Sequence, residues 1–92
     1  MSKFLIEVTH EDKKAECARV VELFLKTGSH FLKQADWGCM DGEHKAWIIA
    51  DVGSKEEARY ILPPIFRSKA KIISLNKFAL DDIEEELHQH HD

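Results

Sequence analysis

A turn signal between two alternating segments constrains this chain more than any other feature. Asp41-Gly42 accepts the positive φ angles of a tight β-hairpin, and apolar and polar residues alternate on both sides of it. The sequence therefore predicts one strand over His30–Met40 and its partner over Glu43–Val52. The stretch 34–47 also holds both tryptophans, one of the two cysteines and one of the six histidines, so we expect any functional site on or beside this hairpin.

A two-residue turn also determines which residues of the two strands face one another. With the turn at 41–42, Trp37 lies opposite Ala46 and Cys39 lies opposite His44. This register brings a thiol and an imidazole together beside the turn.

Apolar spacing and turn residues predict the remaining elements. Pro63-Pro64 ends the second main helix, and Pro64 is suited to open one further short turn. In chain order, the elements predicted outside the hairpin are a strand over Lys3–Val8, a helix from Glu11 to about Lys26, a helix from Ser54 to about Leu62, a strand over Lys71–Phe78 and a helix over Ala79–His88.

Capping residues mark the ends of the predicted helices. Thr9 with Asp12, and Ser54 with Glu57, have the spacing of a capping box at a helix N-terminus. Gly28 lies where the first helix needs a C-terminal cap.

The predicted order of elements, βαββαβ, is typical of the ferredoxin-like α+β fold. Right-handed crossovers place both main helices on one face of a four-stranded antiparallel sheet. We expect residues 1–78 to form this domain and residues 79–92 to add an acidic C-terminal helix with a His-rich tail.

The two faces of the predicted sheet differ in polarity. The smoother face belongs against the helices and consists of Phe4, Ile6, Val8, Ala46, Ile48 and Ala50. On the other face, each large apolar side chain stabilises an assembly by about 1.5 kcal/mol or more if it is fully buried. We therefore expect a homodimer with a semi-enclosed lumen between two such faces, which carry Leu5, Leu32, Trp47, Ile49, Ile72 and Phe78.

At this point the chain resembles a known family. The stretch HFLKQADWGCMDGEHKAWIIADV, followed by SKEEAR, LPPIFRSKAKI and LNKF, is similar to a group of short uncharacterised bacterial proteins of the dimeric α/β-barrel superfamily. That superfamily includes muconolactone isomerase-like enzymes, cofactor-free monooxygenases, stress-responsive barrels and small metal-responsive proteins. The resemblance implies a dimeric α/β barrel, and it matches no shared catalytic motif residue by residue.

Strand alternation places a set of acid/base groups on the lumen face. Asp36, Glu7 and His30 are the candidate catalytic residues, because a partly desolvated carboxylate has a raised pKa and can move protons near a carbonyl. The other interpretation, which we favour, is a hydrogen-bonded polar seam between two subunits.

Three further residues are candidates for ligand binding. Trp47 provides a flat apolar wall for a ring, and Asn76 shares its face. Arg67 follows the rigid Pro-Pro pair and is suited to clamp a carboxylate or phosphate at the mouth of the lumen, although a surface arginine without a role is more common.

Cys39 and His44 are a candidate pair of metal ligands, because sulfur and imidazole suit zinc, nickel and copper. A third ligand would come from His10, His30, Asp41 or a second chain. Alternatively, the imidazole lowers the thiol pKa and creates a nucleophile or redox sensor. The favoured interpretation is a buried structural Cys39, and Cys17, on the inner stripe of the first helix, is expected to be core.

Composition excludes several classes of protein. The net charge of −4 and the absence of a basic stripe argue against nucleic-acid binding. No apolar run has the roughly 20 residues of a membrane span, and no signal peptide is apparent. Two cysteines 22 positions apart, outside any paired motif, suggest reduced thiols in a cytoplasm.

Taken together, the sequence favours a cytoplasmic homodimer that binds a small aromatic or carboxylated molecule in its lumen, with no cofactor expected. One alternative is an isomerase or cofactor-free monooxygenase that uses the lumen acid/base groups. Another is a metal-responsive protein that binds zinc or nickel.

Overall fold

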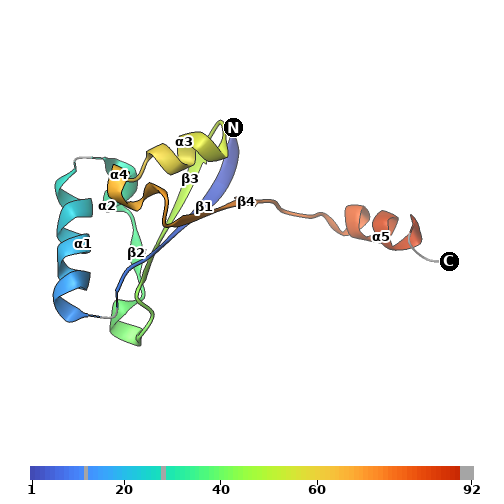
Figure 1. Cartoon of the computed structure of the whole chain (residues 1–92). Coiled ribbons are helices and arrows are strands. Elements are labelled where there is room, and N and C mark those ends of the chain that lie inside the picture. The colour runs from blue at the N-terminus through green and yellow to red at the C-terminus, as the bar shows by residue number, and fades with distance from the viewer. Residues whose placement is uncertain (12, 28, 90–92) are drawn as a thin grey trace.

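The computed structural model describes residues 1–11, 13–27 and 29–89, and it is an α+β structure built on one four-stranded antiparallel sheet (Figure 1). The strand order is β2-β3-β1-β4, which is compatible with the ferredoxin-like class. The elements are β1 (Ser2–Thr9), α1 (Lys14–Lys26), α2 (His30–Lys33), β2 (Asp36–Trp37), the 3₁₀ helix η1 (Cys39–Asp41), β3 (Lys45–Val52), α3 (Lys55–Tyr60), α4 (Pro64–Arg67), β4 (Ala70–Leu75) and α5 (Leu80–Gln89).

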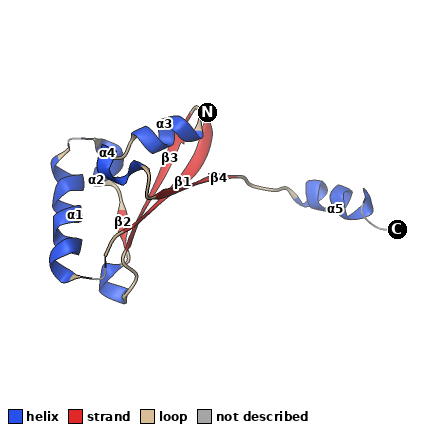
Figure 2. Ribbon diagram, viewed as in Figure 1, coloured by secondary structure: helices blue, strands red, loops and turns tan. Residues whose placement is uncertain are grey.

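One face of the sheet forms the core. Helices α1 to α4 pack on this face, and each contributes a side chain to a single buried cluster (Figure 2). Alternation along the strands explains the choice of face, because every second residue points to the same side. The inner-face prediction is confirmed: all six of its residues are buried, namely Phe4, Ile6, Val8, Ala46, Ile48 and Ala50.

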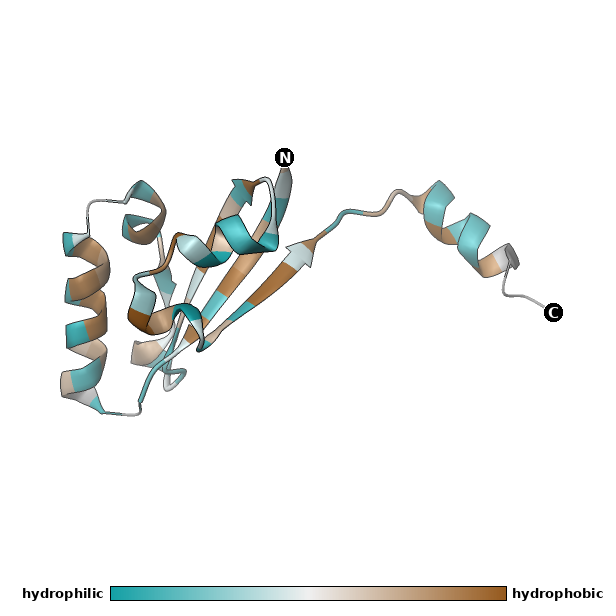
Figure 3. Cartoon of the chain, turned by 45° about the horizontal axis from the view of Figure 1, so that its top comes forward, coloured by the Kyte–Doolittle hydropathy of each residue, from teal (hydrophilic) through white to brown (hydrophobic). Residues whose placement is uncertain are grey.

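The opposite face of the sheet is open in this chain. Leu5 pairs with Ile49 on one side and with Ile73 on the other, which gives an apolar row across three strands. Ile49 is 61% exposed. Figure 3 shows apolar residues, in brown, along the strands of the sheet.

Three residues predicted for the open face lie elsewhere. Phe78 lies beyond the sheet, because β4 ends at Leu75 rather than at Phe78. Ile72 is buried with the core, because β4 pairs it with Ile6 of the inner face. The two faces of this strand were predicted the wrong way round, and Ile73 and Leu75 occupy the open side instead. Leu32 is only 2% exposed and belongs to α2.

The predicted strand over His30–Met40 is wrong except at Asp36–Trp37. Its first part is the short helix α2, and its last part is η1. The predicted pairing of Trp37 with Ala46 is confirmed. The two-residue hairpin turn is replaced by a longer loop, in which Gly42 ends η1 with φ of 84°.

Gly38 closes this longer loop. Its amide donates to the carbonyl of Lys45 at 3.1 Å, and its carbonyl accepts from the amides of Asp41 and Glu43 at 3.0 Å. A Cβ atom at position 38 would lie 2.9 Å from the Glu43 carbonyl and from the Trp47 ring. A side chain therefore does not fit at this point.

Ser54 caps the N-terminus of α3 as predicted, but the Glu57 carboxylate binds the amide one residue before the cap. The Ser54 hydroxyl accepts from the amide of Glu57 at 3.1 Å, and the Glu57 carboxylate accepts from the amide of Gly53 at 3.0 Å. Helix α3 ends before Pro63, and Pro64 opens α4, as predicted. Helix α1 begins at Lys14 rather than near Glu11, so the prediction of Thr9 as its N-cap is wrong: Thr9 ends β1, and Lys13 takes the cap position. The other predicted caps, Asp12 and Gly28, lie outside the described residues.

Helix α5 stands apart from the rest of the chain at the end of an extended segment after β4 (Figure 1). The radius of gyration is therefore 16.7 Å, whereas a compact chain of this length has about 12 Å. Residues of the predicted His-rich tail, His90 and His91, lie outside the described part of the chain. Among the described residues, no helix has the length and apolar character needed to cross a membrane.

Candidate metal centre

Four side chains with metal-binding atoms meet at one end of the sheet. They are His10, Cys17, Cys39 and His44, and one donor atom from each lies within 4.8 Å of the others. Two imidazoles and two sulfur atoms are the donor set of a tetrahedral zinc site.

The sheet positions the two histidines. His10 directly follows β1, and its amide donates to the carbonyl of His44 at 3.0 Å. This bond continues the β1–β3 ladder by one pair beyond Thr9 and Lys45. The imidazole rings lie edge to face, with centroids 5.7 Å apart.

Two short-range features position the cysteines. Cys17 lies in the first turn of α1, where its amide donates to the carbonyl of Lys13 at 3.0 Å. Cys39 begins η1, directly after the close contact at Gly38. The two cysteines therefore approach the histidines from the helix layer and from the loop.

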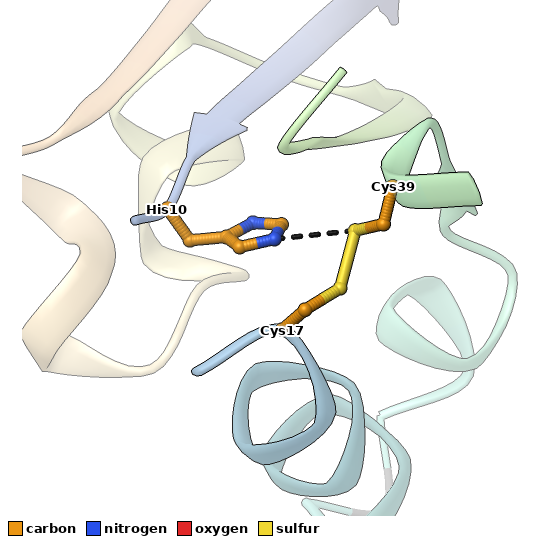
Figure 4. The surroundings of a disulfide bond; sticks show 3 residues. All are labelled: His10, Cys17 and Cys39. Atoms are coloured by element: carbon orange, nitrogen blue, oxygen red, sulfur yellow. Dashed lines mark hydrogen bonds between the residues drawn. A yellow bond between two sulfur atoms is a disulfide. The ribbon is translucent and has the colours of Figure 1, made fainter. Parts of the chain in front are cut away.

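In this structure a disulfide bond joins Cys17 and Cys39, and Nε2 of His10 lies 3.2 Å from Sγ of Cys39 (Figure 4). The predictions of two reduced thiols and of a purely packing role for Cys17 are therefore wrong. Sequence spacing did not show that the first turn of α1 passes beside η1.

The backbone holds the two cysteines relatively far apart. Their Cα atoms are separated by 7.1 Å, whereas disulfides usually have a Cα separation of about 4.4–6.8 Å. A metal ion between two sulfur atoms needs a wider spacing than a direct bond, because tetrahedral Zn–S bonds of about 2.3 Å place the sulfur atoms about 3.8 Å apart. The backbone spacing thus suits a shared metal ion.

His10 has the properties of a metal ligand. It is only 9% exposed, and its pKa is lowered below 6.5, first by burial and then by the nearby His44, while Glu16 acts in the opposite direction. The ring is therefore neutral at pH 7, which is the form that binds metal. Its buried Nδ1 atom has no hydrogen-bond partner among the described residues.

Aromatic side chains close the inner side of this centre. The Trp37 ring lies 6.1 Å from the His10 ring, and Phe24 packs against Trp37 at 5.0 Å. Since an apolar surrounding limits access of water, these contacts strengthen interactions between the donors and a cation.

Part of the predicted acid/base set does come together on the open sheet face. Asp36 pairs with Trp47, and Trp47 pairs with Glu7. The Trp47 indole donates to the Glu7 carboxylate at 3.0 Å, and Nζ of Lys45 lies 3.9 Å from the other Glu7 oxygen. These contacts favour the structural interpretation of Glu7; its catalytic role stays a prediction.

The remaining predicted site residues lie apart from this row. His30 is exposed on α2, where its ring lies 4.1 Å from Phe31. Asn76 lines an open cavity of about 630 Å³ that is also lined by Lys3, Asp51, Leu75 and Lys77.

Arg67 is engaged within the chain. Its Nε donates to the Leu62 carbonyl at 3.0 Å, and a terminal nitrogen donates to the Tyr60 carbonyl at 3.4 Å. The guanidinium also lies over the Tyr60 ring, 4.6 Å from its centroid. These contacts satisfy carbonyls at the end of α3.

Sequence reasoning named three members of this four-residue cluster as candidate metal ligands and missed the fourth. Cys39 and His44 were paired correctly as neighbours, and His10 was one of the proposed third ligands. Cys17 was missed because its position depends on how α1 packs against the loop. The spacing of residues along the sequence does not reveal this packing. No protein-family model, curated protein sequence or solved structure matches this chain.

Proposed function

We propose that this protein binds a transition-metal ion, with Zn²⁺ as the preferred metal, through His10, Cys17, Cys39 and His44 when the cysteines are reduced. The observation that carries this proposal is the convergence of four N and S donors within 4.8 Å. Each donor type is a usual zinc ligand, and four of them complete a tetrahedral site.

A centre with four protein ligands has no open coordination position, so its role is binding and stabilisation rather than hydrolysis. The ligands come from the end of β1, from α1, from η1 and from the segment before β3. A bound ion would therefore tie the helix layer to the sheet, and its binding free energy would add to the stability of the fold. Metal binding at this centre would therefore be read out as a change in the stability of the fold.

Metal titration under reducing conditions tests this proposal. Reduced protein should bind one Co²⁺ per chain with the absorption of tetrahedral cobalt and a sulfur-to-cobalt charge-transfer band, and Zn²⁺ should displace it. Cys17→Ser, Cys39→Ser and His44→Asn should each weaken binding, whereas His30→Asn, which changes an exposed histidine on α2, should not. Absence of stoichiometric binding, or equal loss in His30→Asn, would overturn the proposal.

We propose a homodimer through the open sheet face as a second candidate function, with the ferredoxin-like arrangement of a dimeric α/β barrel. The observation in its favour is the apolar row of Ile49, Leu5 and Ile73, which α5 of the same chain leaves uncovered. Apolar rows of this kind mark interfaces. The cavity lined by Lys3, Asn76 and Lys77 then offers two cations and an amide to a small carboxylated molecule, against the single carboxylate of Asp51.

Two measurements test the second candidate. Sedimentation should show a dimer at micromolar concentration that Ile49→Glu converts to a monomer, while Ile65→Glu, an equally exposed position on α4, leaves it intact. Calorimetry with benzoate as the probe should show binding that Lys77→Ala weakens. A monomeric wild-type chain would exclude the dimer, and no heat with benzoate would exclude this class of ligand.

A further inference from the structure

We infer that the metal centre is reversibly switched by oxidation: a peroxide joins Cys17 to Cys39 and releases the metal ion. This inference rests on the proposed metal binding and adds its regulation. In this inference, the disulfide is the oxidised state of the site, and the four-donor cluster is its reduced, metal-binding state.

The first supporting observation is that the same sulfur atoms belong to both arrangements. Cys17 and Cys39 are bonded to each other and are also half of the four-donor cluster. Because the disulfide uses both sulfur atoms, the two cysteines cannot be bonded to each other and act as thiolate ligands at the same time. Oxidation therefore removes two of its four ligands.

The second observation is that the two histidines lie beside the disulfide in the oxidised chain. Nε2 of His10 lies 3.2 Å from Sγ of Cys39, and the His10 amide donates to the His44 carbonyl at 3.0 Å. Reduction of the disulfide would therefore restore all four donors without refolding. This arrangement makes the switch reversible.

The chemistry balances with hydrogen peroxide as the oxidant. One thiolate attacks the O–O bond and becomes a sulfenic acid, and the departing hydroxide takes up a proton to form water. The second thiolate attacks the sulfenic sulfur, the S–S bond forms, and a second hydroxide leaves and is protonated to water. Two electrons pass from the two sulfur atoms to one peroxide molecule, while the zinc ion leaves as Zn²⁺ with unchanged charge.

The change in charge at the site drives the release. Two thiolates supply two negative charges to the metal, and the disulfide supplies none. Two imidazoles remain, and they are too few ligands for a closed tetrahedral site. We expect the dissociation constant for Zn²⁺ to rise by more than about 1,000-fold on oxidation, since binding at structural zinc sites depends on the full ligand set.

The experiment oxidises zinc-loaded protein with one equivalent of hydrogen peroxide. A chromophoric chelator measures released zinc, a thiol reagent counts thiols, and circular dichroism follows the fold. We expect one zinc ion released for each pair of thiols lost, an unchanged fold, and full recovery of zinc binding after dithiothreitol treatment. Mass spectrometry of peptides should identify the Cys17–Cys39 link.

Met40 requires a control, because its exposed thioether lies next to Cys39 and also reacts with peroxide. Met40→Leu should release zinc as the wild-type protein does. If release is absent in Met40→Leu, if zinc stays bound after oxidation, or if release requires unfolding, this inference is overturned while the proposed zinc binding stands. If reduced protein binds no zinc at all, both are overturned.

Discussion

The amide of His10 donates to the carbonyl of His44 at 3.0 Å, one pair beyond the last residues of the β1–β3 ladder. The pairing of β1 and β3 therefore sets the spacing of the His10 and His44 backbones without a contribution from any helix. Cys17 and Cys39 arrive from α1 and from η1, so the centre joins the sheet to both of these elements. A change in the centre is thereby coupled to the packing of the fold.

The first prediction concerns stability and metal. Zinc at about 100 times its dissociation constant should raise the free energy of unfolding of the reduced protein by about 2.7 kcal/mol, because zinc binds the folded chain preferentially. Urea denaturation with and without zinc measures the difference. Cys39→Ser should show a much smaller gain and Met40→Leu the full gain; equal gains in both variants would contradict the prediction.

The second prediction concerns the contact at Gly38. Gly38→Ala should lower the free energy of unfolding by about 1–3 kcal/mol, because its Cβ would meet the Glu43 carbonyl and the Trp47 ring at 2.9 Å. Gly53→Ala is the matched control, since the nearest atom there is the end of the flexible Glu57 side chain at 3.0 Å. A loss in Gly53→Ala as large as that in Gly38→Ala would argue against the clash.

Sequence patterns could predict the parts of this fold that depend on local rules. The Ser54 cap, the start of α4 at Pro64 and the pairing of Trp37 with Ala46 each follow from a few neighbouring residues. The strand over Lys71–Phe78 was found, but its face was shifted by one residue, because Ile72 and Ile73 are both apolar and alternation cannot choose between them.

The parts that failed depend on tertiary packing. The stretch from His30 to Lys33 was predicted as part of a strand, yet it forms one helical turn that buries Leu32 against the core. A single turn is too short for a helical period to be recognised. Cys17 was missed for a related reason: its helix and η1 meet only after both have packed on the sheet.

The third prediction concerns the structural role of Glu7. Glu7→Ala should cost about 1–2 kcal/mol, because it removes the acceptor of the half-buried Trp47 indole. Glu7→Gln keeps an acceptor oxygen and should recover most of this loss. Thermal unfolding of both variants provides the measurement, and a Glu7→Ala chain as stable as the wild type would show that the hydrogen bond does not stabilise the fold.

The fourth prediction concerns Arg67. Arg67→Ala should lower the free energy of unfolding by about 1–2 kcal/mol, because the carbonyls of Leu62 and Tyr60 lose their donors. Arg67→Lys should not restore it, since one ammonium group cannot reproduce the planar fork of donors. Chemical denaturation measures both variants, and unchanged stability in Arg67→Ala would contradict the structural role of these hydrogen bonds.

The last prediction concerns α5, whose apolar residues Leu80, Ile83 and Leu87 are exposed along one stripe. Replacing Leu80 and Leu87 with serine should change the free energy of unfolding of dilute protein by less than about 0.5 kcal/mol, because exposed positions contribute little to the fold. Leu62→Ala, in the core, should cost about 2–5 kcal/mol. Denaturation of dilute samples compares the two, and a large loss in the double serine variant would mean that α5 packs on its own sheet in solution.

A short amphipathic helix is only marginally stable by itself in water. If the helix signal of the wild-type protein grows with protein concentration, the contact that stabilises α5 lies on another copy of the chain.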